Sequence, residues 1–148
     1  MIRVVIVDDH KLMREGLKAL LAQAGDIQVI GEAANGLEAV DLALQTTPDV
    51  MLMDLAMPEV DGLKATQQIT DLDKDIRVVV ISGHSDQKIL REALKSGARG
   101  YVVKSAGPQE LPLAIRAVHK GEMYFSSEVF SLLSEELVKS MGSLHSAP

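Results

Sequence analysis

The hydrophobic and polar positions of the chain fall into two alternating patterns. Short, unbroken aliphatic runs have the length of β-strands. The stretches between them repeat their apolar residues every three or four positions, the period of a helix with one buried face. The predicted strands are Val4–Val7, Val29–Ala33, Val50–Met53, Val78–Ile81 and Tyr101–Val103. The predicted helices are Lys11–Ala24, Gly36–Thr46, Asp61–Leu72, Gln87–Ser96 and a last helix that begins near Pro108.

This order of elements predicts an α/β fold. A strand followed by a helix occurs five times, and parallel strands require such crossover helices. A parallel sheet covered on both faces also explains why the strands are apolar throughout. We therefore expect a doubly wound, five-stranded parallel sheet in the flavodoxin-like order 2-1-3-4-5, with helices on both faces. Gly97 and Gly121 stand where the fourth and fifth helices should end.

The segment 122–148 breaks the alternation of strand and helix. Met123–Phe125 is followed by an amphipathic pattern over Ser127–Lys139 and then by an end that contains glycine and several serines. We therefore expect a main domain over residues 1–121, and a linker with an extra helix and a flexible tail over 122–148. Two interpretations stay open for this segment: a terminal helix that frays, or a docking helix or tether to a further domain.

Composition and charge narrow the class of protein. The 148 residues, 47% of them hydrophobic, suffice for one buried core and exclude disorder throughout. A net charge of −6 argues against direct binding of this chain to nucleic acid. Without cysteine there is neither a disulfide nor a thiolate zinc site. No apolar run approaches the roughly 18 residues of a membrane helix or resembles a secretory signal, so we expect a cytoplasmic protein without membrane contact.

Ionisable and hydroxyl side chains follow four of the five predicted strands. Asp8 and Asp9 follow the first strand, Asp54 the third, Ser82 the fourth and Lys104 the fifth. The carboxyl ends of these four strands are neighbours in the order 2-1-3-4-5, and ligands of open α/β sheets bind at that edge. The sequence therefore predicts one pocket that holds three carboxylates, a hydroxyl group and an ammonium group.

Three neighbouring carboxylates call for a cation, because like charges raise one another's pKa values. Lys104 supplies a single positive charge. A site made of carboxylate oxygens suits Mg²⁺, with Mn²⁺ as a substitute, better than zinc. With a metal bound, an accessible carboxylate can attack a phosphoryl group, and Ser82 can donate a hydrogen bond to the product. The chemistry predicted is the formation and loss of an aspartyl phosphate.

Each of these residues alone has a simpler interpretation. An Asp before a helix is usually an N-cap, a single Lys is usually a surface charge, and a Ser after a strand is usually a turn residue. Asp54 is harder to explain in this way, because a carboxylate that closes a buried central strand is costly unless it is solvated or coordinated. The coincidence of all five residues at one edge of the sheet favours the functional interpretation.

These residues resemble the receiver domain of two-component response regulators. The resemblance covers about residues 1–120 and includes Asp8-Asp9, the segment Asp54-Leu55-Ala56-Met57-Pro58-Glu59-Val60-Asp61-Gly62, Ser82 and Lys104. It implies a signalling protein, not an enzyme, with only self-phosphorylation from small donors and self-dephosphorylation. The phosphoryl donor would be a phosphohistidine of a sensor histidine kinase.

The resemblance also implies a role for each matching residue. Asp54 would be the phosphoacceptor, and Lys104 would pair with the phosphoryl oxygens. Asp8, Asp9, Asp54 and the backbone carbonyl of Ala56 would hold Mg²⁺. Ser82 would move toward the new phosphate and Tyr101 would turn inward behind it, which changes the surface around the fourth helix, fifth strand and fifth helix.

The segments Gly97–Lys104 and Gly121–Ser126 resemble the NarL/FixJ branch of this family. Full-length members of that branch carry a LuxR-type helix-turn-helix, which this sequence lacks. We therefore expect DNA contact, and control of transcription, only through a domain absent from this chain, and homodimerisation on phosphorylation. A stand-alone or degenerate receiver that acts through protein–protein contacts is the alternative.

Two positions depart from the family's usual pattern. Ser105 follows Lys104 where many receivers have proline, and Gly83 stands where alanine is common. The basic residues near the fourth helix are either a solvated face or part of an output or dimer surface. They are Lys88, Arg91, Lys95 and Arg99.

Three other functional classes fit less well. A serine hydrolase would use Gly83-His84-Ser85-Asp86, but Gln87 occupies the position of the second glycine of a nucleophile elbow. A haloacid-type phosphatase would need a second Asp at the position of Ala56. A flavin or dinucleotide carrier would need a glycine-rich loop after the first strand, where the carboxylates of Asp8 and Asp9 would repel a phosphate.

Overall fold

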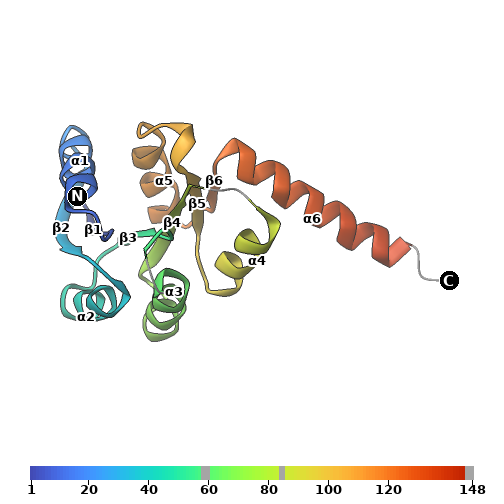
Figure 1. The fold of residues 1–148 in the computed structure, drawn as a ribbon, viewed down its shortest axis with the longest axis horizontal. Coiled ribbons are helices and arrows are strands. Elements are labelled where there is room, and N and C mark those ends of the chain that lie inside the picture. The colour runs from blue at the N-terminus through green and yellow to red at the C-terminus, as the bar shows by residue number, and fades with distance from the viewer. Residues whose placement is uncertain (58–60, 84–85, 146–148) are drawn as a thin grey trace.

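The computed structural model describes residues 1–57, 61–83 and 86–145. Its strands are β1 (Ile2–Val7), β2 (Ile27–Ala33), β3 (Val50–Asp54), β4 (Arg77–Ser82), β5 (Gly100–Val103) and β6 (Tyr124–Phe125). Its helices are α1 (Lys11–Ala22), α2 (Gly36–Thr46), α3 (Asp61–Leu72), α4 (Gln87–Lys95), α5 (Glu110–His119) and α6 (Ser127–His145), with a 3₁₀ turn, η2 (Lys104–Ala106). Strand and helix alternate as the hydrophobic pattern predicts (Figure 1).

The sheet is parallel, and its order is β2-β1-β3-β4-β5-β6. The predicted order 2-1-3-4-5 is therefore confirmed for the first five strands, but the expectation of a five-stranded sheet is wrong. A sixth strand, Tyr124–Phe125, pairs with the outer edge of β5. The two residues are too few to give a periodic signal, and their pairing depends on the edge that β5 offers. The sheet thus continues past residue 121.

Helices cover both faces of the sheet and form two apolar cores. Alternate residues of each strand point to opposite faces, so Val4 and Ile6 pack with α1 and α5, whereas Val5 and Val7 pack with α2, α3 and α4. Val129, at the start of α6, is fully buried in the core that contains Val5 and Val7. The central strands are buried on both faces, which accounts for their continuous apolar sequence.

Local sequence sets both ends of α4. The Asp86 side chain accepts a hydrogen bond from the backbone N–H of Ile89 (2.8 Å) and caps α4. Gly97 ends that helix with φ of +97°, and a Cβ atom there would lie 2.6 Å from the Thr70 hydroxyl oxygen. Glycine is required at this turn both for its backbone conformation and for the close approach of α3.

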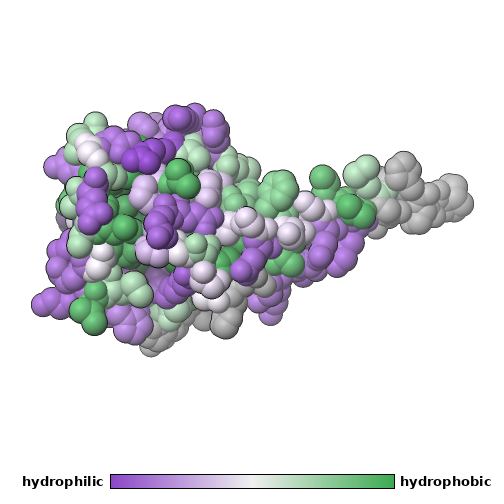
Figure 2. All heavy atoms as spheres, turned by 90° about the horizontal axis from the view of Figure 1, so that it is seen from above, coloured by the Kyte–Doolittle hydropathy of each residue, from purple (hydrophilic) through white to green (hydrophobic). Residues whose placement is uncertain are grey.

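Helix α6 runs from the sheet past α4 (Figure 1) and is longer than the predicted Ser127–Lys139. It continues through Gly142 to His145, so the tail expected after Lys139 is helical over this stretch. Serine and glycine lower helix propensity by only about 1 kcal/mol or less each, which a preceding helix can tolerate. Figure 2 shows apolar side chains exposed along this projecting helix. They are Phe130, Leu137, Val138 and Met141.

Polar pairs connect α6 to α4. The Gln87 amide donates to Glu135 (2.9 Å) and accepts from Lys139 (3.1 Å), and Arg91 lies 3.5 Å from Glu136. Arg91, one of the four basic residues singled out by the sequence, therefore faces α6 and is not a freely solvated charge. Within the described ranges, no helix is long and apolar enough to cross a membrane.

Candidate functional site

The carboxyl ends of β1, β3, β4 and β5 bring the predicted site residues to one edge of the sheet. Asp8 and Asp54 are each only 2% exposed, and Ser82 is 4% exposed. Asp54 ends β3 opposite Ile81 of β4, which places it in the middle of this edge. Lys104 begins η2, directly after β5. The strand order alone thus produces the convergence that the sequence predicts.

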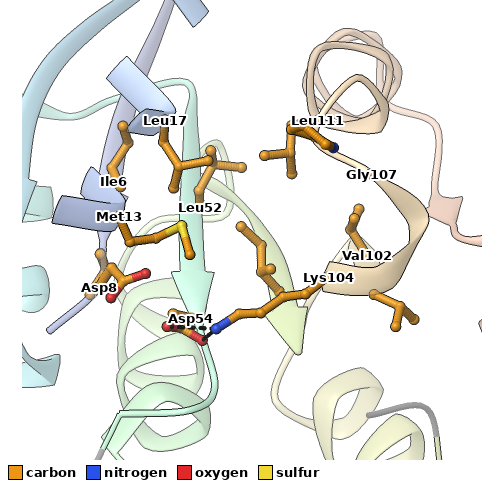
Figure 3. Close-up of a pocket in the computed structure, with 14 residues that line it drawn as sticks. Ile6, Asp8, Met13, Leu17, Leu52, Asp54, Val102, Lys104, Gly107 and Leu111 are labelled. Carbon is orange, nitrogen blue, oxygen red and sulfur yellow. Dashed lines mark hydrogen bonds and ion pairs between the residues drawn. The ribbon is translucent and has the colours of Figure 1, made fainter. Parts of the chain in front are cut away.

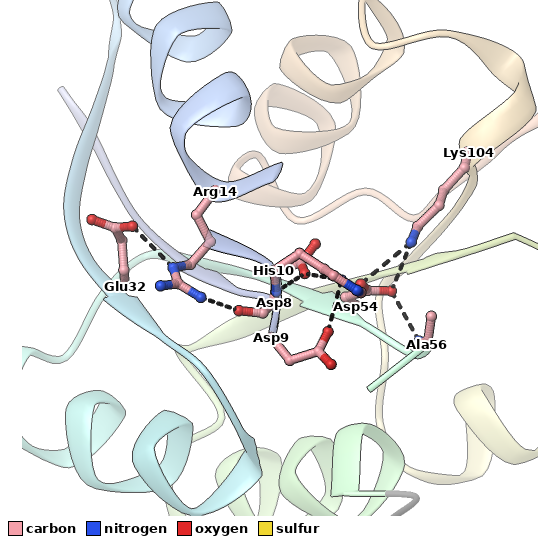
Figure 4. A network of polar contacts seen from close by, with 8 residues as sticks. All are labelled: Asp8, Asp9, His10, Arg14, Glu32, Asp54, Ala56 and Lys104. Carbon is pink, nitrogen blue, oxygen red and sulfur yellow. Dashed lines mark hydrogen bonds and ion pairs between the residues drawn. The ribbon is translucent and has the colours of Figure 1, made fainter. Parts of the chain in front are cut away.

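Asp54 is held between Lys104 and its own loop (Figure 4). The Lys104 ammonium nitrogen lies 3.3 Å from each carboxylate oxygen. The backbone N–H of Ala56 donates to Asp54 Oδ1 at 2.9 Å. This contact fixes the loop after β3, and the role of the Ala56 carbonyl oxygen as a metal ligand stays a prediction.

Asp8 and Asp9 stand beside Asp54 in the loop between β1 and α1. Ligand atoms of Asp8, Asp9, His10 and Asp54 all lie within 4.8 Å of one another. The His10 backbone N–H donates to Asp8 Oδ1 (2.8 Å), and the His10 ring nitrogen Nδ1 lies 3.0 Å from Asp9 Oδ1. That Asp9 oxygen is buried, and within the described residues the His10 ring is its polar neighbour. His10 joins this group without having been predicted.

The electrostatics of the cluster favour a bound cation. Burial raises the pKa of Asp8, the His10 N–H lowers it in part, and the charge of Asp54 raises it further. A set made mainly of carboxylates, with Asp9 Oδ1 buried beside the His10 ring, fits the hard-oxygen preference of Mg²⁺. The residues present therefore suit Mg²⁺.

Ser82 and Tyr101 form a second buried contact behind the carboxylates. Tyr101 is 1% exposed, and its hydroxyl group is hydrogen-bonded to the Ser82 side chain. Burial raises the pKa of Tyr101, so the ring stays neutral. The two residues that the resemblance pairs in the switch are therefore already in contact, with the tyrosine turned inward.

The strand that carries Tyr101 is also bonded to the start of α6. The Ser126 backbone N–H donates to the Tyr101 carbonyl, and the Ser126 hydroxyl accepts from the Val103 backbone N–H, each at 3.0 Å. Ser126 is 1% exposed. The serine-rich composition around Ser126 predicts a linker, and these two contacts could not be predicted because the partners lie more than 20 residues away.

An apolar cavity of about 250 Å³ adjoins the site, between α1 and α5 (Figure 3). Met13, Leu52 and Leu111 line its interior, and Asp54 and Lys104 lie at one side. The low-dielectric wall strengthens the Asp54–Lys104 attraction relative to bulk water.

Two predicted features lie outside the described residues. His84 and Ser85, considered for hydrolase chemistry, belong to this group, as does the part of the Asp54 loop at positions 58–60. Gly83, exposed beside the site, would meet nothing within 4 Å if it carried a Cβ atom. Ser105 lies in the 3₁₀ turn that starts at Lys104.

Comparisons with known proteins agree with this geometry. The sequence profile of the response regulator receiver domain matches residues 4–116. The chain is 42% identical over 127 residues to the uncharacterized transcriptional regulatory protein YhcZ of Bacillus subtilis, covering 86% of this chain and 59% of that protein. A crystal structure of a LuxR-family two-component response regulator from Aurantimonas superposes with a TM-score of 0.87 and 37% identity, over 92% of this chain and 97% of that one.

A second solved structure is the isolated REC domain of RcsB from Salmonella enterica in the presence of the phosphomimetic BeF3−. It is 26% identical, with a TM-score of 0.79, over 88% of this chain and 97% of that one. The chain spans about three fifths of the length of the curated relatives it matches, such as YhcZ.

Proposed function

Because the chain belongs to the response regulator receiver domain family, as the match over residues 4–116 shows, we propose that it takes a phosphoryl group onto Asp54 from a phosphohistidine of a sensor histidine kinase. The observation that carries the proposal is a buried carboxylate with both oxygens 3.3 Å from Lys104 and with Asp8 and Asp9 beside it. Burying a carboxylate without a partner costs free energy of folding, and clusters of this kind, with a charged partner and a perturbed environment, are typical of reactive sites.

The transfer balances without a further reactant. An Asp54 carboxylate oxygen forms the new bond to phosphorus, the bond from phosphorus to the donor's histidine nitrogen breaks, and that nitrogen keeps the electron pair. Lys104 pairs with phosphoryl oxygens, which it can reach by a small shift from its present contact with Asp54. Asp8, Asp9 and Asp54, with the Ala56 carbonyl, would hold Mg²⁺, which would neutralise charge on the phosphoryl oxygens.

Phosphorylation then acts through Ser82 and Tyr101. The phosphoryl group adds about −1.5 to −2 charge and three strong acceptors next to Ser82. Donation from Ser82 to that group replaces its present hydrogen bond with Tyr101. We propose that this shift changes the surface made by α4, β5 and α5, promotes homodimerisation, and controls transcription through a DNA-binding domain outside this chain.

The domain boundary expected at residue 121 remains part of this proposal. Residues 1–121 would form the receiver domain and residues 122–148 the linker segment. The pairing of β6 with β5 and the burial of Val129 support a linker whose first part is docked on the receiver.

The test is the intact mass of the protein after incubation with Mg²⁺ and acetyl phosphate. We expect one phosphoryl adduct on the wild type, none on Asp54→Ala, and none when EDTA is present. Asp41→Ala, which removes an exposed carboxylate on α2, is the matched control and should gain the adduct. If the wild type gains no adduct under any condition, the chain is a degenerate receiver that acts through protein contacts alone.

A further inference from the structure

The Arg14 side chain, on α1, bonds to the main chain of the loop between β1 and α1, which carries Asp8 and Asp9 (Figure 4). Its Nη1 donates to the backbone carbonyl oxygen of Asp8 at 2.6 Å, and its Nε donates to Glu32 Oε1 at 3.1 Å. The Arg14 side chain is only 16% exposed. One guanidinium group therefore joins the end of β2 to the main chain of a residue that holds the metal.

Few other contacts hold this loop. The Asp8 N–H donates to the Ala33 carbonyl (3.0 Å), which continues the pairing of β1 with β2. The His10 N–H donates to Asp8 Oδ1, which is one of the carboxylate oxygens of the proposed metal-ligand set. His10 stands at the N-cap of α1 and makes no side-chain cap, and the first turn contains no acidic residue. Arg14 thus supplies the one side-chain bond to the loop, among the described contacts, that leaves every carboxylate oxygen available.

Glu32 is held by a second cation, Lys18, and can therefore orient Arg14. Lys18 donates to its second oxygen, Oε2, at 2.9 Å. The hydrogen bond from Lys18 is the largest cause that holds the pKa of Glu32 below its usual range, and the bond from Arg14 adds to it. Glu32 therefore stays ionised at neutral pH. A planar guanidinium can donate hydrogen bonds to a carbonyl and a carboxylate at fixed angles, whereas the donors of a lysine ammonium rotate on a flexible stem.

We infer that Arg14 is a positioning residue for the metal site: braced by Glu32, it holds the Asp8 main chain so that the Asp8 and Asp9 carboxylates are arranged before Mg²⁺ binds. This inference rests on the proposed function, since it concerns the same site. Residues that orient metal ligands commonly change metal affinity by about 10- to 100-fold when they are replaced.

The test measures Mg²⁺ affinity by calorimetric titration and amide hydrogen exchange at residues 8–10 without metal. We expect Arg14→Ala to weaken Mg²⁺ binding about tenfold and to speed exchange in the loop. Arg14→Lys should recover only part of the affinity, and Glu32→Gln should weaken binding by about two- to threefold, since it removes the brace alone. Glu32→Gln also keeps the test decisive if Arg14→Ala does not fold.

Arg116→Ala is the matched control. Arg116 forms a comparable bidentate pair with Asp26, at 2.8 and 2.9 Å, but Asp26 precedes β2 and lies at the opposite edge of the sheet. The Arg116→Ala variant should leave both Mg²⁺ affinity and hydrogen exchange at residues 8–10 unchanged. If the Arg14 and Glu32 variants have the same Mg²⁺ affinity and the same loop exchange as the wild type, the inference is overturned while the proposed function stands. A wild type that binds no Mg²⁺ would count against the proposed function, and unchanged loop exchange in Arg14→Ala would still overturn the inference by itself.

Discussion

Replacing Asp8 by Asn should stabilise the metal-free protein. Asp8 and Asp54 are both buried, and their ligand oxygens lie within 4.8 Å of each other. At that separation two unit charges repel by about 3.5 kcal/mol with an effective dielectric constant of about 20. Asn has nearly the same shape and can still accept the His10 N–H bond, but as a weaker acceptor. We therefore expect a net gain of about 2 kcal/mol in the free energy of unfolding.

The assay is urea unfolding at neutral pH, with EDTA and with saturating Mg²⁺. Wild type should gain about 2.7 kcal/mol at a Mg²⁺ concentration of 100 times Kd, because the metal binds only the folded state. Asp8→Asn should gain far less, so the advantage of the variant disappears when metal is added. Asp41→Asn makes the same change in net charge on the exposed face of α2, and its stability should stay close to that of the wild type.

The pH dependence tests the same buried carboxylate, whose pKa is raised chiefly by burial and further by the charge of Asp54. The pKa of Asp8 is raised in the folded state, so the metal-free folded protein binds more protons than the unfolded chain at pH values between about the ordinary 3.8 and the raised pKa of the folded state. Stability from this group is therefore greatest below that value and falls as pH rises through the folded pKa. Asp8→Asn should lack this fall. A variant that is less stable than the wild type in EDTA, with an unchanged Asp41→Asn control, would refute the reasoning.

Three further outcomes are expected. Gly97→Ala should lower the free energy of unfolding by more than 1 kcal/mol in urea titrations, because alanine there is strained at φ of +97° and collides with α3; an unchanged midpoint would contradict this. Ser126→Ala should cost about 1–3 kcal/mol because the buried Val103 N–H loses its acceptor, whereas Ser126→Thr should retain most of the stability. The pKa of Tyr124 is raised to about 12, by burial and by its hydrogen bond to Glu110, so its stabilising effect should be complete below pH 10 and lost as pH rises toward 12. Ultraviolet titration should show this, and Glu110→Gln should lower that pKa.

The parts of the fold and site that the sequence predicts are those with local or periodic signals. Aliphatic runs and helical spacing predict five strands and their crossover helices, and the strand order then brings Asp8, Asp54 and Lys104 together. No contact between these residues had to be known, because parallel strands end at a common edge. This is why a site assembled from distant positions could be predicted without a structure.

The features that were missed depend on contacts between distant segments. β6 is two residues long and exists because β5 offers a free edge, and α6 continues past a composition typical of linkers. Arg14 and Glu32 are 18 positions apart, on a helix and a strand whose facing side chains follow only from packing. Each charged residue looks like an ordinary surface residue in the sequence.

Because α6 is attached to the sheet at its first residues, a small rotation there moves its far end by a much larger distance. Its base is fixed by the backbone and hydroxyl hydrogen bonds of Ser126 and by the pairing of β6, all of which end on the strand that carries Tyr101. Beyond that base, its polar contacts with α4 are surface pairs in which only Glu136 is partly buried, and such pairs usually contribute about 1 kcal/mol or less each. A helix of 19 residues is about 28 Å long. A rotation of about 10° at the base therefore carries the far end through about 5 Å, so a displacement too small to disturb the sheet becomes a large one at the tip of the helix.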